Sequence, residues 1–246
     1  MPAATTVTGM VLSAMPVGDY DKRLVVLTKE LGKISAFAKG ARRPNSALLA
    51  CSQPFSFGEF DLYAGRTSYT ITSADISNYF PELRTNVDRV YYGMYFCEFA
   101  DYITKENNDE KEILKLLYQT LKAVAKGTIE LPLIRLVFEF KMMALSGIAP
   151  QVFECVKCEK EGNTYRFSAD SGGLLCEDCR MEDRGAIPLS TSSIYTLQYI
   201  ISRDVENLYT FKVSMEVLNE LTICVRRYLN YYIDHQFKAG ELLQSL

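Results

Sequence analysis

Residues that favour β-strands dominate the first 77 positions of the chain. Short apolar runs recur there, some alternating with polar residues as in Lys33–Ala38, and turn-forming residues separate them. The pattern predicts five strands, over residues 6–13, 23–28, 33–38, 55–63 and 68–76, with 64–67 as a hairpin loop. Five short antiparallel strands in about 75 residues fit a small closed barrel such as the OB-fold.

From Pro81 onward the apolar residues recur at helical spacing. They predict five helices, over about 81–102, 113–124, 129–146, 188–201 and from 214 onward. Gly127 and Gly147 end the second and third helices, and Ser190 or Thr191 caps the fourth. The apolar stripe expected in the first helix comprises Val87, Val90, Tyr91, Met94, Tyr95, Phe99 and Tyr102. We interpret these stripes as the core of a helical bundle, because their spacing explains the aromatic residues without a base-stacking role.

Four cysteines form two Cys-x-x-Cys pairs, listed here in chain order: Cys155 and Cys158, then Cys176 and Cys179. Their spacing is typical of a four-thiolate zinc site, and residues 165–175 between them predict a β-hairpin with a Gly-Gly turn. Four thiolates fill the tetrahedron of Zn²⁺, so the metal is expected to be structural rather than catalytic. Two disulfides are the alternative, although each would close a very small loop.

Composition places the chain among globular proteins. Its apolar fraction is 48%, and no stretch approaches the ~18 apolar residues of a membrane helix. The first 17 residues have no basic segment before their apolar residues, so no signal peptide is expected. The other cysteines, Cys51, Cys97 and Cys224, lie among apolar neighbours and are expected to be buried thiols. An odd number of cysteines without an export signal favours the cytoplasm.

The net charge of −3 does not indicate a nucleic-acid-binding protein, but an average charge can hide a local basic cluster. Lys39, Arg42 and Arg43 follow the third predicted strand, and no acidic residue lies within eight positions on either side of the cluster. Long cationic side chains in such a loop can reach a phosphate backbone. A solvated loop is the alternative, and charge alone does not decide between the two.

Candidates for catalysis are few. His235 is the only histidine, and it lies near the end of the last predicted helix, where it suits the helix dipole. The chain contains neither a Walker-type phosphate loop nor a Gly-x-Ser-x-Gly motif. The sequence therefore predicts a protein that is not an enzyme.

Several motifs together resemble the RecO family of bacterial recombination mediators, over most of the chain. The motifs are Gly18-Asp-Tyr-Asp21, Ala38-Lys-Gly-Ala-Arg42, Leu145-Ser-Gly-Ile-Ala-Pro150, Cys155-Val-Lys-Cys158 and Gly172-Gly-Leu-Leu-Cys176. There are two departures. Asp19-Tyr-Asp21 stands where the family commonly has Glu-x-Asp, and Lys238-Ala-Gly240 replaces a more basic ending of the last helix.

The resemblance implies the α+β class, with an N-terminal five-stranded OB-fold barrel followed by an α-helical bundle and an inserted zinc-ribbon-like module. The expected segments are the barrel, the first helical part, the zinc module and the second helical part, over residues 1–80, 81–150, 151–185 and 186–246. Such proteins bind single- and double-stranded DNA, anneal complementary strands and act with RecR to load RecA onto SSB-coated DNA. A nucleoid-associated protein of the cytoplasm is implied, with no membrane and no small-molecule substrate.

Two functions follow as hypotheses. The first is DNA binding in recombination, with Lys39, Arg42 and Arg43 at the centre of the site and with Lys22, Arg23, Lys33 and Arg66 as further candidates. The second is a zinc-stabilised protein-interaction scaffold that binds no nucleic acid. By the resemblance, the helical domain also receives the acidic, Phe-ended tail of SSB. The helix 133–143 offers Arg135, Phe138, Lys141 and Met142 for that tail, unless it is only a core helix with two solvated cations.

Overall fold

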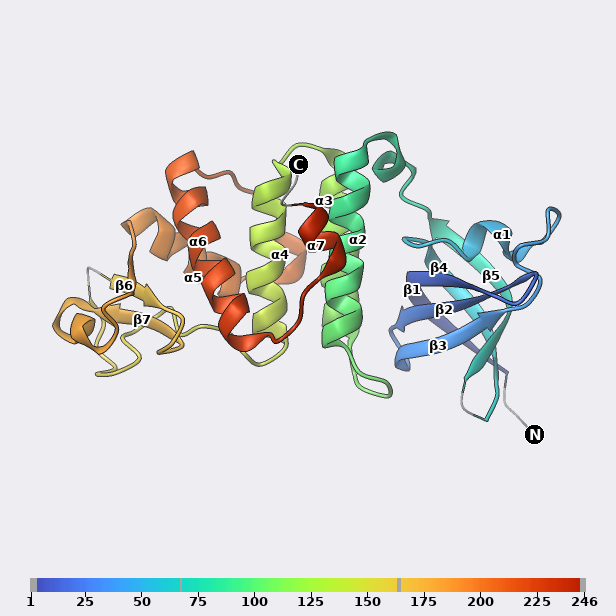
Figure 1. Cartoon of the computed structure of the whole chain (residues 1–246), viewed down its shortest axis with the longest axis horizontal. Coiled ribbons are helices and arrows are strands. Elements are labelled where there is room, and N and C mark those ends of the chain that lie inside the picture. Colours follow the sequence, from blue (N-terminus) through green and yellow to red (C-terminus); the bar gives the residue numbers. More distant parts are fainter. Residues whose placement is uncertain (1–3, 67, 163–164, 244–246) are drawn as a thin grey trace. The chain divides into compact units, whose positions relative to one another are not determined.

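The computed structural model describes residues 4–66, 68–162 and 165–243. The chain divides into two compact units, Met1–Lys126 with Phe237–Leu246, and Gly127–Gln236. The first unit holds a β-barrel and the long helices α2 and α3, and the second holds α4, α5, α6 and a small sheet (Figure 1). Within the described ranges, no helix is both long and apolar enough to cross a membrane. The division into a barrel, two helical parts and a zinc module, expected from the sequence, stays a prediction.

Five strands close the predicted barrel, which confirms the OB-type fold. They are β1 (Ala4–Val17), β2 (Asp21–Thr28), β3 (Gly32–Ala38), β4 (Phe57–Ala64) and β5 (Tyr69–Asn78). The strand order is β1-β2-β3-β5-β4, with β3 parallel to β5 and β1 antiparallel to β4. Alternate residues of the strands, such as Leu24, Val26, Ile34 and Ala36, fill the interior. Their neighbours in sequence therefore point to the outside of the barrel.

The barrel differs from the expectation in two places. β1 continues to Val17 rather than residue 13, because its second half stays paired with β2 as far as Asp21. A single helical turn, α1 (Leu48–Cys51), precedes β4, and one turn is too short to produce a recognisable period in the sequence. Thr67 of the expected hairpin loop lies outside the described residues.

Two helices pack against the barrel within the first unit. A short 3₁₀ helix, η1 (Pro81–Thr85), leads into α2 (Val87–Ile103), and α3 (Lys111–Lys126) follows. The buried stripe expected for α2 was wrong in part, since Val87, Met94 and Tyr102 are exposed. The residues that α2 buries are Gly93, Tyr95, Phe96, Cys97, Phe99 and Ala100. Because α2 carries apolar residues almost all round, its sequence did not define one inner face.

The C-terminal segment returns to α2 and forms α7 (Lys238–Leu242), which the sequence did not predict. The ring of Phe237 stacks on Phe99, with 4.6 Å between the ring centroids, and Tyr95 meets it edge-on at 5.6 Å. The Glu98 carboxylate accepts hydrogen bonds of 2.9 Å from the backbone N–H groups of Lys238 and Ala239. A carboxylate at these free N–H groups stabilises the start of a helix.

We expect Phe237→Ala to release this segment and to lower the free energy of unfolding by about 2–4 kcal/mol, because a packed aromatic ring is lost. Phe237→Leu keeps apolar volume at the same place and should cost less than half as much. Thermal unfolding and limited proteolysis of the C-terminus measure the effect. Equal stability of the alanine variant and the wild type would contradict this role for Phe237.

The second unit is built on α4 (Leu131–Leu145), α5 (Thr191–Ser202) and α6 (Met215–Tyr232). The predicted cap of α5 is confirmed, because the Ser190 hydroxyl accepts from the backbone N–H of Ser193 at 3.3 Å. Glu220 on α6 supports this cap by accepting from the Ser190 backbone N–H at 3.0 Å and from the Ser193 hydroxyl at 2.6 Å. These bonds join the start of α5 to α6.

A small sheet packs on these helices. It consists of β6 (Tyr165–Ser168), β7 (Gly173–Cys176) and β8 (Ile187–Pro188), and β6 and β7 form the predicted hairpin. The hairpin turn requires glycine, since Gly172 has φ +83° and a Cβ on Gly173 would lie 2.2 Å from the Gln151 carbonyl oxygen. The ring of Phe167 on β6 lies 6.5 Å from that of Phe140 on α4 and 5.7 Å from that of Tyr228 on α6.

Candidate metal centre and nucleic-acid interface

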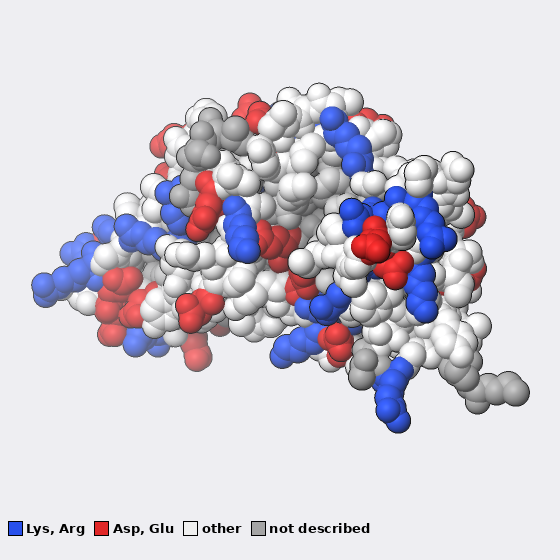
Figure 2. All heavy atoms as spheres, turned by 45° about the vertical axis from the view of Figure 1, so that its right-hand side comes forward, with Lys and Arg blue, Asp and Glu red and all other residues white. Residues whose placement is uncertain are grey.

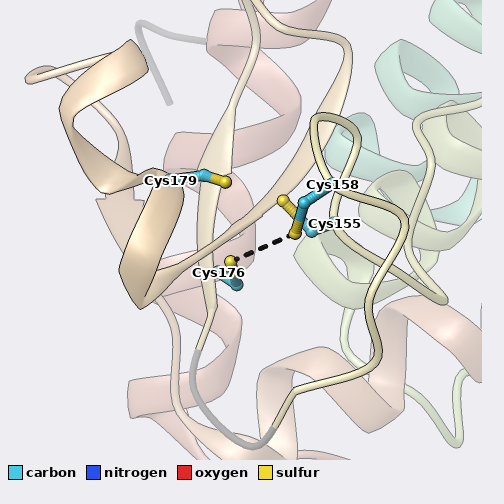
Figure 3. Close-up of side chains that lie close together, drawn as sticks. All are labelled: Cys155, Cys158, Cys176 and Cys179. Atoms are coloured by element: carbon cyan, nitrogen blue, oxygen red, sulfur yellow. Dashed lines mark hydrogen bonds between the residues drawn. The ribbon is translucent and has the colours of Figure 1, made fainter.

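The four predicted cysteine ligands lie together (Figure 3). Cys155 and Cys158 come from the loop after α4, Cys176 ends β7, and Cys179 belongs to the 3₁₀ helix η2 (Glu177–Glu182). Their sulfur atoms all lie within 4.8 Å of one another, and those of Cys158 and Cys176 are 3.7 Å apart. All seven cysteines of the chain are free, so the two small disulfides that were the alternative are not formed.

The local backbone shapes this cluster. The Cys155 N–H donates to the Lys160 carbonyl at 3.1 Å, and the Glu159 N–H donates to the Cys155 carbonyl at 2.9 Å, which folds residues 155–160 into a tight turn. Glu159 adopts φ +57° to complete the turn. The Val156 N–H donates to the Leu174 carbonyl at 2.9 Å and so holds the turn against β7. The first pair of sulfurs is thereby held beside the second.

The spacing of the sulfurs fits a tetrahedral metal ion. Four thiolates around Zn²⁺, each at about 2.3 Å, place neighbouring sulfurs about 3.8 Å apart. Cys155 is fully buried and Cys176 is 9% exposed, whereas Cys158 and Cys179 are partly exposed, so the cluster has one buried side and one side near the solvent. Four protein ligands leave no position for a water or a substrate, and the arrangement therefore suits a structural ion.

The ionisation of the cluster depends on whether a cation is bound. Burial raises the pKa of the Cys155 thiol, but backbone N–H groups of Cys176, Cys158 and Lys157 outweigh burial and lower it to about 6. Burial and the neighbouring sulfurs raise the pKa of Cys179 to about 12. The four thiols therefore cannot all ionise near neutral pH by themselves. A bound divalent cation reverses this, because a coordinating thiol loses its proton.

The basic loop, which we define as residues 39–43, is held on the turn between β1 and β2. The Gly40 N–H donates to the Asp21 carboxylate at 2.7 Å, and the Arg42 N–H donates to the Tyr20 carbonyl at 2.8 Å. Ala41 is fully buried beneath the loop. The two N-terminal sequence motifs, which are 20 residues apart, are thus parts of one structure.

The three cations of the basic loop point outward from this support. Arg42 donates one hydrogen bond, from Nη1 to the Gly18 carbonyl at 3.2 Å, and keeps most of its guanidinium donors for other partners. The Arg43 guanidinium lies over the Tyr20 ring, 5.1 Å from its centroid. Lys39 is exposed, and its side chain makes no hydrogen bond or ion pair with the residues that the structure describes. On the right of Figure 2, where the barrel lies, Lys and Arg side chains are interspersed with Asp and Glu side chains, so this face is not uniformly basic.

The other predicted cations are placed differently. Lys22 donates to the carbonyl and the hydroxyl of Ser52, each at 3.1 Å, and burial lowers its pKa. Lys33 forms an ion pair of 3.0 Å with Asp101 on α2. Arg23 is exposed on β2 and Arg66 is exposed after β4. Arg23 pairs with Phe37, two residues before the basic loop, and its Nε donates to the Ser35 hydroxyl at 2.9 Å, whereas Lys22 and Lys33 are engaged within the protein.

We expect Asp21→Ala to loosen the basic loop, because the Gly40 N–H would lose a charged acceptor. Hydrogen bonds to charged groups contribute about 1.5–3 kcal/mol, so a loss of about 1 kcal/mol or more is expected at this partly exposed site. Asp21→Asn keeps an acceptor oxygen and should cost less. Amide hydrogen exchange at Gly40 and thermal unfolding compare the two, and equal exchange rates in both variants and the wild type would contradict the role of Asp21.

The residues suggested for the SSB tail lie mainly in the core of the second unit. Phe138 and Met142 are fully buried, and Lys141 is 6% exposed, with its ammonium donating to the Ile201 carbonyl at 2.9 Å. Arg135 reaches the surface and forms a 2.7 Å ion pair with the buried Glu139. Neither cation is simply solvated. The position of a tail-binding site on α4 stays a prediction, and of this set only Arg135 is available at the surface to support it.

Sequence comparison extends these observations to known proteins. The profile described as "Recombination protein O N terminal" matches residues 1–80, and "Recombination protein O C terminal" matches residues 84–241. A protein named DNA repair protein RecO from Alkaliphilus metalliredigens is 36% identical over 97% of this chain and 98% of its own length. Its namesake from Acetivibrio thermocellus is 32% identical over 97% of this chain and 95% of its own length. With both profiles matched and such relatives covered almost from end to end, the chain belongs to the RecO family.

Proposed function

We propose that this chain is a DNA-repair protein that binds single- and double-stranded DNA, anneals complementary strands and, with RecR, helps load RecA onto SSB-coated DNA. The relatives named DNA repair protein RecO support the repair role. The observation that carries DNA binding is the basic loop, held by Asp21 and Tyr20 on the β1–β2 turn of an OB-type barrel. In OB-folds, the face of strands 2 and 3 and the adjoining loops bind oligonucleotides.

Phosphate contacts explain why one surface would accept both forms of DNA. Lys39, Arg42 and Arg43 lie together at the end of β3, and Arg23 is exposed on the neighbouring β2. Cations that contact phosphates carry no base information and release condensed counterions when they bind. Such a surface binds without sequence preference, as annealing requires. Lys22 and Lys33 would contribute mainly by holding the barrel to Ser52 and Asp101.

The metal of the cysteine cluster is proposed to be one structural Zn²⁺ per chain. A closed set of four thiolates is the usual ligand set of structural zinc. No step of the function depends on this ion, and we propose that the chain has no catalytic activity. Its partners would be DNA, RecR and the SSB tail, and it would act on the nucleoid in the cytoplasm. For the tail, Arg135 is the side chain of the predicted set that a carboxylate would reach.

Binding of labelled oligonucleotides at two salt concentrations tests the proposal. Three to four phosphate contacts predict that affinity for a single strand falls about twentyfold to fiftyfold between 50 and 200 mM salt. The same chain should speed the annealing of complementary strands and leave non-complementary strands unpaired. If neither single-stranded nor duplex DNA binds at 50 mM salt, the chain is instead a zinc-stabilised interaction scaffold.

A further inference from the structure

The outer face of the barrel carries exposed apolar and aromatic side chains next to its cations. In the strand register, Met15 on β1 lies opposite Arg23 on β2, and Arg23 lies opposite Phe37 on β3. Paired residues point to the same side of a sheet, and their sequence neighbours Leu24, Ala36 and Ala38 fill the barrel core. Met15, Arg23 and Phe37 therefore form one row across the outside of three strands. Met15 is 65% exposed, and Phe37 is half-buried.

Tyr20 continues this surface at the β1–β2 turn. The residue is 52% exposed, and the Arg43 guanidinium lies over its ring, 5.1 Å from the centroid. Its backbone carbonyl accepts the Arg42 N–H at 2.8 Å, which ties the turn that carries the ring to the basic loop. A ring that is held on one side by a guanidinium and is open to solvent over half its area can accept a second planar group by stacking.

The mixture of side chains indicates which nucleic acid fits. A surface that only follows phosphates needs cations, and exposed rings and methionines add nothing to it. In a duplex the base faces are covered by their neighbours in the stack. Unpaired bases leave these faces open, and proteins that bind single strands combine a basic path with aromatic side chains for this reason. Two acids lie nearby: Asp21 accepts from the Gly40 N–H, and Asp19 is exposed beside Tyr20, so the cations must outweigh their repulsion of phosphates.

We propose that Tyr20, together with Phe37 and Met15, forms a base-stacking platform that selects unpaired nucleotides. The proposal rests on the proposed DNA binding and assigns the recognition of single strands to these residues, while the basic loop supplies the contacts common to both forms of DNA. An acidic peptide is an alternative occupant of the same apolar and basic surface. Measuring how Tyr20→Ala binds oligo-dT distinguishes a DNA strand from a peptide.

Three probes of equal length test the platform on the full chain: oligo-dT, the same backbone with abasic sites, and a duplex. Loss of one stacked base predicts that Tyr20→Ala binds oligo-dT at least about fivefold, and up to about 150-fold, more weakly. Its affinity for the abasic strand and the duplex should change less than twofold. Tyr20→Phe keeps the ring and should bind all three probes as the wild type does. Tyr195→Ala, which removes an even more exposed tyrosine from α5, is the control outside the barrel.

Equal weakening on all three probes would overturn the proposal, because Tyr20 would then act only by placing Arg43. Unchanged binding of oligo-dT by Tyr20→Ala would also overturn the proposal. An acidic peptide would then be the better candidate for this surface. In both cases the wild type still binds DNA, so the proposed function stands. If the wild type binds none of the probes, the proposed function itself fails and the platform fails with it.

Discussion

Cys176→Ser is expected to unfold the small sheet and to lower the melting temperature of the protein by roughly 10 °C or more. Metal binding is coupled to folding in sites of this kind, and loss of a structural metal is among the few changes that cost more than about 4 kcal/mol. For a chain of this size, each kcal/mol moves the melting temperature by about 2–4 °C. Calorimetry together with metal analysis of the purified protein measures both the stability and the bound ion.

The effect should spread from the metal centre into the helices. Cys176 ends β7, β7 pairs with β6, and Phe167 of β6 packs between Phe140 and Tyr228. When the sheet opens, the two rings on α4 and α6 lose a common partner. A strong chelator should therefore reproduce the Cys176→Ser phenotype in the wild type.

Cys51→Ser is the matched control for this prediction. The Cys51 thiol is also buried, but it donates to the Leu48 carbonyl at 3.5 Å, a bond that a serine hydroxyl can replace. The melting temperature of the Cys51→Ser variant should be at most a few degrees below that of the wild type. A wild-type protein that is free of metal and keeps its full stability would contradict the account of the cysteine cluster.

Replacing Arg42 and Arg43 together by alanine is expected to weaken DNA binding about tenfold or more at 50 mM salt. The loss should shrink toward zero near 1 M salt, because it comes from counterion release. The slope of log affinity against log salt should flatten by about 0.7–0.9 for each lost phosphate contact. Different sequences should lose affinity alike, since phosphates carry no base information.

Lys122→Ala with Lys126→Ala removes the same charge from exposed positions on α3 and serves as the control. If affinity depends only on net charge, the two double variants will behave alike. If the basic loop contacts phosphates, only the arginine pair changes the slope. An unchanged slope in the arginine variant would place the DNA on another surface.

The parts of the fold that depend on local sequence could be predicted. The alternation in β3 and the helical spacing in α3 arise because each element buries one face. The first Cys-x-x-Cys pair lies in a tight turn formed by nearby residues, so its local structure also follows from local sequence. α7 could not be predicted, because its position depends on Glu98 and Phe99, which lie about 140 residues earlier. The buried face of α2 was misjudged for a similar reason, since tertiary packing chose one face of an evenly apolar helix.

Side-chain partners distant in sequence explain the differences at the candidate site. Lys22 and Lys33 were expected at the DNA surface from charge alone, and only the fold brings Ser52 and Asp101 to them. Lys141 was expected to bind a tail carboxylate, or else to be solvated, but it lies beside the Ile201 carbonyl, 60 residues away. Tyr20, which we propose stacks on a base, could not be identified from the sequence although it lies inside the motif 18–21. Its pairing with Arg43 arises only when the loop folds onto the turn.

Photo-cross-linking tests directly whether single-stranded DNA lies across β2, β3 and the basic loop. An oligo-dT strand carrying 5-iodouracil at one position would be bound to the full chain, irradiated, and the cross-linked peptides identified by mass spectrometry. Cross-links are expected in the peptides that contain Tyr20 and Phe37, and they should disappear when salt releases the DNA. Cross-links confined to residues of the second unit, 127–236, would contradict this placement of the strand.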